Sequence, residues 1–247
     1  MRLYLIRHGE SENNVLYQGS ENTPGRKPDP TLSDKGHSQA RLLGEHLVTP
    51  GNEPMQHPYH SGNDYDHGIK TLYCSLMLRS ILTAGYVAKT CNLKAEALLD
   101  VFERKGLYEV NESGAETGIA GPGRDYFSEH FPELILPQSL TTDGWYNRTV
   151  ESDTEFVARV ESSLENLLQQ HGNSNDHIAL VAHGDYVDQF INAIMQINRH
   201  KENYAGAWEA NWVSHNTAIT RVDFADRYCS VIYSNRTEHL PAELITW

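Results

Sequence analysis

Hydrophobic residues occur along the chain in two kinds of run. Short continuous runs, typical of strands that are buried on both faces, lie at 3–6, 71–74, 98–102 and 177–182. Longer runs with a three-and-four spacing predict helices over 34–49, 79–91, 153–172 and 186–197. Strands that alternate with helices favour an α/β fold, a three-layer α/β/α sandwich around a mostly parallel central sheet.

The carboxyl half of the chain adds shorter features to this pattern. A short helix is expected around 125–130, and the runs 217–224 and 228–233 are joined by a brief turn and alternate like paired strands near a sheet edge. Three polar stretches interrupt the pattern, at about 19–30, 50–70 and 112–148. Because none of them resembles an interdomain linker, we expect one domain over 1–247 with these stretches as insertions, the last a candidate cap on the substrate side.

Charged residues stand where the apolar runs stop. The first run ends in Arg7-His8-Gly9-Glu10-Ser11, the third in Glu103 and Arg104, and the fourth in His183 and Gly184. Ligands of parallel sheets bind at the carboxyl ends of the strands, so these side chains are expected to meet. A guanidinium beside an imidazole suits phosphoryl chemistry, because Arg presents a fork of donors to phosphate oxygens and neutral His can be a nucleophile.

A further arginine, Arg79, falls near the start of a predicted helix. The positive end of a helix dipole disfavours a cation, but it favours an anion. An arginine at this place is reasonable if it shares a bound phosphate with the backbone donors of the helix. Taken singly, each of these residues also has a structural explanation, and the functional interpretation depends on their convergence.

Composition narrows the classes of function. The formal net charge of −13 disfavours nonspecific nucleic-acid binding and partnership with anionic membranes. No apolar run approaches the roughly 18 residues that span a bilayer, and the opening apolar run is too short for a signal peptide, so a cytoplasmic protein is expected. The three isolated cysteines, Cys74, Cys91 and Cys229, indicate neither a disulfide framework nor a thiolate metal site.

These motifs together resemble the histidine phosphatase superfamily, branch 1, which includes cofactor-dependent phosphoglycerate mutases and many phosphomonoesterases. The signature is Arg7-His8-Gly9-Glu10-Ser11, and the segment 76–84 is similar to the one that carries the second arginine of the family. Phe102-Glu103-Arg104 matches the stretch with the acid, and Ala182-His183-Gly184 the stretch with the second histidine. The resemblance covers nearly the whole chain and implies a phosphoglycerate mutase-like fold.

The resemblance also implies roles for individual residues. His8 would be the nucleophile and form a phosphohistidine, Glu103 the acid and then the base, and Arg7, Arg79 and His183 the groups around the phosphoryl oxygens. Glu109 and Glu112 lie close by in the sequence and are alternatives to Glu103. Further phosphate-side contacts are expected from Asn14, Gln18, Gly19, Arg104 and Gly184. The reaction implied needs no metal ion and no other cofactor.

Three functions remain open at this point. The first is a metal-independent phosphomonoesterase that hydrolyses a small phosphorylated metabolite, the second a phosphoglycerate mutase, and the third a catalytically silent protein that binds a phosphorylated ligand. Extra residues at 19–29 and the unmatched stretch 114–148 flank the expected pocket and weigh modestly towards hydrolysis. Homodimer formation is left open.

Some features suit a structural role at least as well as a functional one. His57, His60, His67 and the acids in 64–66 suggest a metal site, but their spacing fits no ligand template and favours a polar loop. Trp145 and Tyr146 suit either a pocket wall or ordinary packing. Arg124 is a candidate contact for a second anionic group of the substrate.

Overall fold

The computed structural model describes residues 1–17, 24–49, 67–195, 211–225 and 228–247. Its centre is a six-stranded sheet in the order β3-β2-β6-β1-β7-β8. The strands are β1 (Arg2–Arg7), β2 (Thr71–Ser75), β3 (Ala95–Leu98), β6 (His177–Ala182), β7 (Ile219–Ala225) and β8 (Tyr228–Arg236). The first four are mutually parallel, whereas β7 and β8 are antiparallel to their neighbours, so the sheet is mixed but mostly parallel, as predicted.

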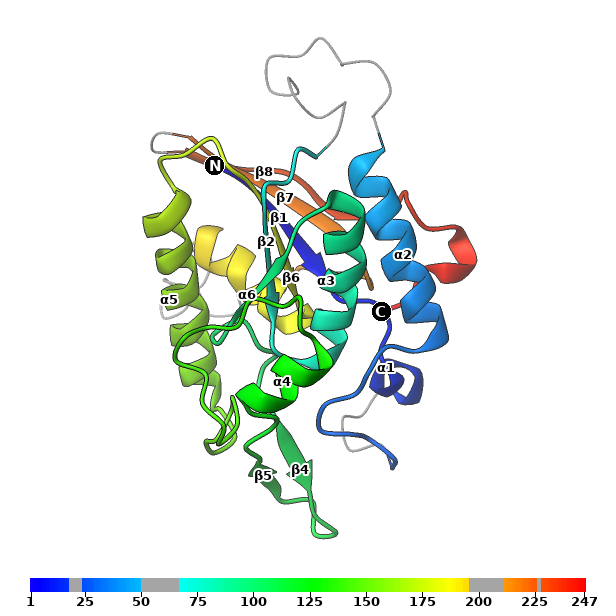
Figure 1. Ribbon diagram of the computed structural model, residues 1–247, viewed down its shortest axis with the longest axis vertical. Helices are drawn as coiled ribbons and strands as arrows, with labels where there is room; N and C mark the ends of the chain where they lie inside the picture. Colours follow the sequence, from blue (N-terminus) through cyan, green and yellow to red (C-terminus); the bar gives the residue numbers. More distant parts are fainter. Residues whose placement is uncertain (18–23, 50–66, 196–210, 226–227) are drawn as a thin grey trace, which may run out of the picture.

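Helices cover both faces of the sheet (Figure 1). On one side α2 (Asp34–Val48) packs against α3 (Leu78–Cys91), and on the other α5 (Asp153–His171) packs against α6 (Gly184–Met195). The remaining elements are α1 (Glu12–Leu16), α4 (Arg124–His130), the short 3₁₀ helix η2 (Ala242–Leu244) and a small hairpin of β4 (Tyr108–Val110) and β5 (Glu116–Gly118). In Figure 1 this hairpin projects below α4, away from the sheet.

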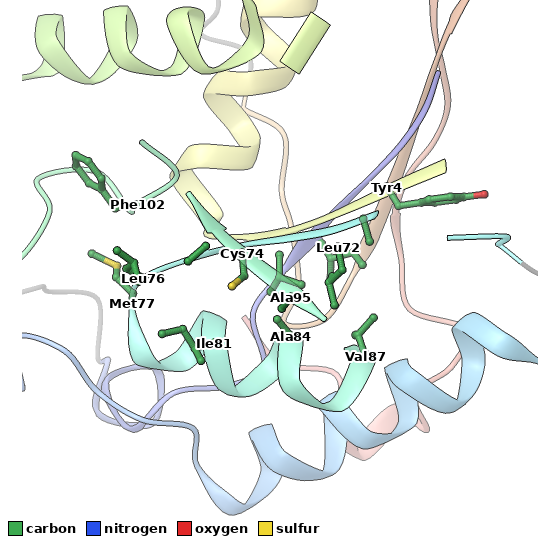
Figure 2. Packing of buried hydrophobic residues seen from close by; sticks show 14 of the residues in the cluster. Tyr4, Leu72, Cys74, Leu76, Met77, Ile81, Ala84, Val87, Ala95 and Phe102 are labelled. Carbon is green, nitrogen blue, oxygen red and sulfur yellow. The ribbon is translucent and has the colours of Figure 1, made fainter. Parts of the chain in front are cut away.

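The continuous apolar run of β1 is explained by these two layers. Tyr4 and Ile6 belong to the hydrophobic cluster on the α2–α3 side, and Leu3 and Leu5 belong to the cluster on the α5–α6 side. All four are nearly inaccessible to solvent because successive side chains of a strand point to opposite faces. Figure 2 shows how α3 packs its apolar face against β2 and β3 in the first cluster.

Local sequence explains where the main helices begin. The Ser33 side chain accepts a hydrogen bond from the Gly36 amide at the start of α2, and Ser152 forms a capping box with Glu155 at the start of α5. In contrast, Met77 precedes α3 and supplies no side-chain cap.

The structure corrects the expected strand at 98–102. Here β3 is Ala95–Leu98, and the residues from Leu99 to Glu103 lie outside any strand. Cross-strand pairing with β2 stops at Leu98, so the acid follows an irregular segment and not a strand end. The polar connection 12–34 also contains α1, which was not predicted.

Side chains of the 112–148 stretch contribute to the core. Phe127, Leu140, Trp145 and Tyr146 are buried in the cluster on the α2–α3 side. Arg124 donates hydrogen bonds to the backbone carbonyls of Leu140 and Pro137. None of the described residues that line the large cavity discussed below comes from this stretch, so a role as a cap over that cavity finds no support.

No helix in the described part of the chain combines the length and the apolar character needed to cross a membrane.

Candidate active site

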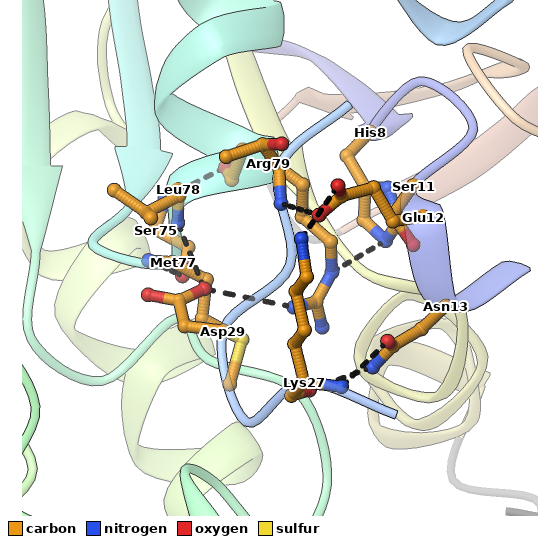
Figure 3. A network of polar contacts seen from close by, with 12 residues as sticks. His8, Ser11, Glu12, Asn13, Lys27, Asp29, Ser75, Met77, Leu78 and Arg79 are labelled. Atoms are coloured by element: carbon orange, nitrogen blue, oxygen red, sulfur yellow. Dashed lines mark hydrogen bonds and ion pairs between the residues drawn. The ribbon is translucent and has the colours of Figure 1, made fainter. Parts of the chain in front are cut away.

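His8 directly follows β1 and is almost completely buried, with 2% of its surface exposed. Its Nε2 atom accepts a hydrogen bond from Nε of Arg79 at 3.0 Å, shown in Figure 3. Because an arginine Nε always carries hydrogen, the imidazole proton must reside on Nδ1, which lies 2.7 Å from the Gly9 carbonyl and donates to it. The lone pair of His8 is therefore held on Nε2.

The surroundings keep this imidazole neutral. Burial lowers the pKa of His8 well below its usual value, and the nearby charges of Arg79 and Arg7 lower it further. A neutral imidazole of fixed tautomer with its lone pair on one known atom is suited to act as a nucleophile.

Arg79 occupies the second position of α3 and is itself buried. Its positive charge is balanced by Asp29, whose Oδ1 atom lies 3.9 Å from Nη1 of Arg79 and also accepts a hydrogen bond from the Leu78 amide at 3.1 Å (Figure 3). Asp29 therefore supplies the cap that Met77 cannot. Burial raises the pKa of Asp29 to about 6.

Sequence reasoning overlooked Asp29. The signal available was indirect: a helix that starts with an arginine and has no capping side chain of its own needs an acceptor from elsewhere.

Arg7 is the last residue of β1 and directly precedes His8. Its Nη1 atom donates to the Ser214 carbonyl at 2.6 Å, whereas its buried Nε has no hydrogen-bond partner among the described residues. A Cβ atom on residue 184 would lie 3.4 Å from Nε of Arg7 and 3.8 Å from a carboxylate oxygen of Glu103. Gly184 therefore lies within contact distance of both charged groups.

His183 directly follows β6, and its ring centroid lies 5.2 Å from that of His8. The residue is fully buried, and neither ring nitrogen has a hydrogen-bond partner among the described residues. Burial, together with the charge of Arg79, lowers its pKa well below the usual value. A buried imidazole with both nitrogens unpaired beside a nucleophile is expected to bind a ligand atom.

Glu103 is held at the amino-terminal end of α6. Its carboxylate accepts hydrogen bonds from the amides of Tyr186 at 3.2 Å and Asp185 at 3.4 Å, and from the amide of Arg104 at 3.0 Å. Burial, followed by repulsion from the Asp185 carboxylate, raises the pKa of Glu103 to about 7. A carboxyl group with such a pKa can both donate and accept a proton near neutral pH.

Four of these groups line a cavity of about 530 Å³, whereas His183 is not among its lining residues. Arg7, His8, Arg79 and Glu103 line it, whereas Glu109 and Glu112, the alternatives to Glu103, do not and are exposed. Its outer wall includes Asn14, Arg26, Arg104, Tyr108, Asp188 and Trp212.

The other predicted contacts are placed differently. Asn14 lines the cavity, but its side-chain oxygen accepts hydrogen bonds from Ser11 and belongs to the capping box of α1. Arg104 also lines the cavity, and its guanidinium is paired with Asp153 at 2.7 and 3.0 Å. Gln18 and Gly19 lie outside the described residues.

The chain segment that carries the nucleophile rests on the first turn of α2. A Cβ atom on Gly36 would lie 2.0 Å from the Glu10 carbonyl oxygen, and a Cβ on Gly9 would lie 2.6 Å from the Gly36 carbonyl oxygen. In addition, Oε1 of Gln39 accepts a hydrogen bond from the Glu10 amide at 2.7 Å. These close contacts between α2 and the site could not be inferred from the hydrophobic pattern.

Within the described residues, no three His, Cys, Asp or Glu side chains are arranged to hold a metal ion. His57, His60 and the acids in 64–66 lie outside these residues, and the described His67 packs its ring against Tyr4 and His46. Trp145 and Tyr146 pack in the core beside Phe102 and do not line the cavity.

The chain is similar to known proteins in both sequence and structure. A curated relative is phosphoserine phosphatase 1 of Hydrogenobacter thermophilus, 25% identical over 186 residues, which are 74% of this chain and 71% of the relative. Among solved structures, phosphoserine phosphatase of Entamoeba histolytica matches with a TM-score of 0.55 and 20% identity, covering 97% of this chain and 99% of the other.

The ecdysone phosphate phosphatase of Bombyx mori matches with a TM-score of 0.62 and 16% identity, over 98% of this chain and 95% of that one. Both structures share the fold described above. The family model of the histidine phosphatase superfamily (branch 1) matches residues 3–237. This chain therefore belongs to the histidine phosphatase superfamily, branch 1.

Proposed function

We propose that this protein is a phosphomonoesterase that hydrolyses a small phosphorylated metabolite through a phosphohistidine on Nε2 of His8. The observation that carries the proposal is the neutral His8 imidazole, whose lone pair meets the Nε–H of Arg79 in a cavity that Glu103 also lines. The relatives described as phosphatases of phosphoserine support a phosphate ester of a small metabolite as substrate.

In the first step, Nε2 of His8 attacks phosphorus and the bond between phosphorus and the ester oxygen breaks. The protonated Glu103 carboxyl gives its proton to the departing oxygen, so that an alcohol leaves. The Nε–H of Arg79, freed from the lone pair of His8, turns to a phosphoryl oxygen, and Arg7 and His183 supply further donors. The hydrogen bond from Nδ1 of His8 to the Gly9 carbonyl stabilises the positive charge that develops on the ring.

In the second step, the Glu103 carboxylate takes a proton from a water molecule as the water oxygen attacks phosphorus. The bond between phosphorus and Nε2 breaks, its electron pair returns to His8, and inorganic phosphate leaves. Both steps require Glu103 to change protonation state, which its raised pKa of about 7 permits. The four positions that we assign to catalysis and phosphate binding around His8 are Arg7, Arg79, Glu103 and His183.

The remaining predictions about the molecule as a whole are part of the same proposal. We propose a single domain that acts in the cytoplasm without a metal ion or another cofactor. The net charge of −13 argues against nucleic acid or an anionic membrane as partner, and it requires that a small anionic substrate be bound in a locally cationic pocket.

The experiment is phosphate release from a panel of phosphomonoesters that includes phosphoserine and 3-phosphoglycerate, in the presence of EDTA. We expect turnover that survives the chelator, and a loss of at least about a thousandfold in His8→Ala, because no other described side chain places a lone pair at this position. A phosphoenzyme that is labile to acid and absent from the variant should form with the substrate.

Two results would contradict the proposal. Turnover retained in His8→Ala would exclude a phosphohistidine on His8 as the intermediate. Turnover that EDTA abolishes and a divalent cation restores would exclude the metal-independent mechanism. Transfer of the phosphoryl group to a second phosphoglycerate without phosphate release would instead identify a mutase.

A further inference from the structure

We propose that Glu151 and Arg159 form a positioning pair that holds the Glu103 segment in place. The inference rests on the proposed function, in which Glu103 is the proton donor. Arg159, on α5, forms a bidentate ion pair with Glu151, with Nε to Oε1 at 2.6 Å and Nη2 to Oε2 at 2.8 Å. Little of either side chain is exposed, 9% of Arg159 and 4% of Glu151.

The third nitrogen of the guanidinium is directed to the backbone that leads to Glu103. Nη1 of Arg159 donates to the carbonyl of Asp100 at 2.8 Å and to the carbonyl of Phe102 at 3.0 Å. The Glu151 amide donates a hydrogen bond of 3.4 Å to the carbonyl of Lys105, which follows Glu103 in the sequence. The pair therefore contacts the backbone both before and after the acid.

The Phe102 side chain is fixed by the same group. The guanidinium carbon of Arg159 lies 3.5 Å from the centre of the Phe102 ring, closer than that of Arg148 at 5.7 Å. The rings of Trp145 and Tyr146 lie 5.7 and 5.3 Å from the same ring. Backbone and ring of the residue next to Glu103 are thus both held by Arg159.

This segment needs such support because the sheet does not provide it. The ladder of β3 ends at Leu98, so no cross-strand bonds fix the residues between Leu98 and Glu103. A proton donor must lie within hydrogen-bond distance of the departing oxygen, and an error of about 1 Å in its position costs up to about a hundredfold in rate. An arginine with fixed, directional donors can set the position of a backbone that a hydrophobic contact would leave free to shift.

There is also a physical reason why Arg159 is paired with an acid. A guanidinium with so little exposure needs a counter-charge, because removal of one partner of such an ion pair leaves the other charge uncompensated. Glu151 supplies this counter-charge through Nε and Nη2 of Arg159, which leaves Nη1 to hold the backbone.

The test uses two substrates that differ in their need for a proton donor. Aryl esters such as p-nitrophenyl phosphate have a stable leaving group, whereas the alkyl phosphate that is fastest in the panel described above requires protonation. We expect Arg159→Lys to lower kcat/KM at least tenfold more for the alkyl ester than for p-nitrophenyl phosphate. A lysine ammonium cannot reproduce the planar fork that pairs two nitrogens with Glu151 and directs the third to the two carbonyls.

Three further variants make the result interpretable. Glu103→Gln should change the ratio of the two kcat/KM values in the same direction and by more. Arg221→Lys is the matched control, since Arg221 is a buried arginine paired with Asp223 at 2.7 and 2.6 Å on β7 and does not line the cavity. It should leave the ratio within twofold of wild type. Glu151→Gln, which keeps the side-chain shape, replaces Arg159→Lys if the latter fails to fold.

The outcomes separate this inference from the proposed function. If Glu103→Gln changes the ratio and neither variant of the positioning pair does so by more than Arg221→Lys, the positioning pair is refuted and Glu103 keeps its role. If Glu103→Gln itself lowers kcat/KM equally for both substrates, Glu103 is not the proton donor. The inference about the positioning pair, which rests on that role, is then refuted too.

Discussion

His8 and Glu103 face one cavity with pKa values that are displaced in opposite directions. Burial dominates both shifts, and it disfavours the charged form in each case: the imidazolium of His8 and the carboxylate of Glu103. At neutral pH the result is a neutral His8 imidazole and a Glu103 carboxyl group that still carries its proton in a large fraction of molecules. One physical cause thus prepares two groups for different tasks.

The pKa of Glu103 predicts the alkaline side of the pH–rate profile. In the free enzyme Glu103 must be protonated to assist the first step, so kcat/KM for an alkyl phosphate should fall as the pH rises through about 7. Glu103→Gln should lower kcat/KM by roughly a hundredfold to ten-thousandfold and abolish this alkaline decrease. The measurement is kcat/KM from pH 5 to pH 9 for both proteins. An alkaline decrease that persists unchanged in the variant would assign it to another group.

At the residue scale the sequence was informative where chemistry and strand ends coincide. His8 and His183 stand at the ends of two strands predicted from continuous apolar runs, so their convergence could be predicted from the pattern alone. Asp29 and the pair of Glu151 and Arg159 could not, because their partners lie far away in the sequence and depend on how the loops fold back. The roles of all these residues remain predictions until variants are measured.

Among the elements, the long helices and central strands were the predictable part. The structure confirms the helices α2, α3 and α5 within one or two residues, because each combines an apolar stripe with an evident start or stop. The expected strand at 98–102 was wrong by several residues, since an apolar run does not reveal where ladder pairing ends. The short α1 and the hairpin of β4 and β5 carry too little periodicity to be recognised.

The packing of α2 on the nucleophile segment leads to a prediction at this scale. Gly36→Ala places a methyl group 2.0 Å from the Glu10 carbonyl oxygen, so the helix or the segment from His8 to Ser11 must move. We expect a loss of about 1–3 kcal/mol in the free energy of unfolding, and a drop in kcat of tenfold or more. Urea unfolding and phosphate release are the measurements.

The chain offers a matched control for this variant. Gly85 lies in α3 and is exposed, and a methyl group added there would meet no atom within 4 Å among the described residues. Gly85→Ala should therefore increase the free energy of unfolding by up to about 1 kcal/mol, through helix propensity, and leave kcat unchanged. If Gly36→Ala behaved in the same way, the close contact with Glu10 would have no functional consequence.

For the molecule as a whole, buried histidines set how stability responds to acid. The His239 ring stacks on His46 at 5.3 Å, and its Nδ1 is buried without a partner among the described residues. Burial, helped by the charges that His46 and His67 can acquire, lowers the pKa of His239 to about 3. The folded state therefore resists protonation of this ring.

The sign of the effect follows from the two states. Unfolded His239 takes up a proton near pH 6.5 and the folded residue only near 3, so stability is full above 6.5 and falls as the pH decreases below it. Between pH 7 and pH 5 the titration of this one group should lower the free energy of unfolding by about 2 kcal/mol, at 1.36 kcal/mol per pKa unit. His239→Gln should make the decrease in the free energy of unfolding smaller by about that amount, as measured by urea unfolding at both pH values. An equal decrease in both proteins would contradict this assignment.

The position of β1 in the sheet has a consequence for how the protein is made. Arg2 pairs with His177 on one side and with Asp223 on the other, so the strand that carries the nucleophile lies between two strands synthesised much later. While the ribosome is still translating the middle of the chain, the segment around His8 has neither neighbour and cannot be enclosed. Catalytic competence then arises late in synthesis, once β6 and β7 have both emerged and closed on β1.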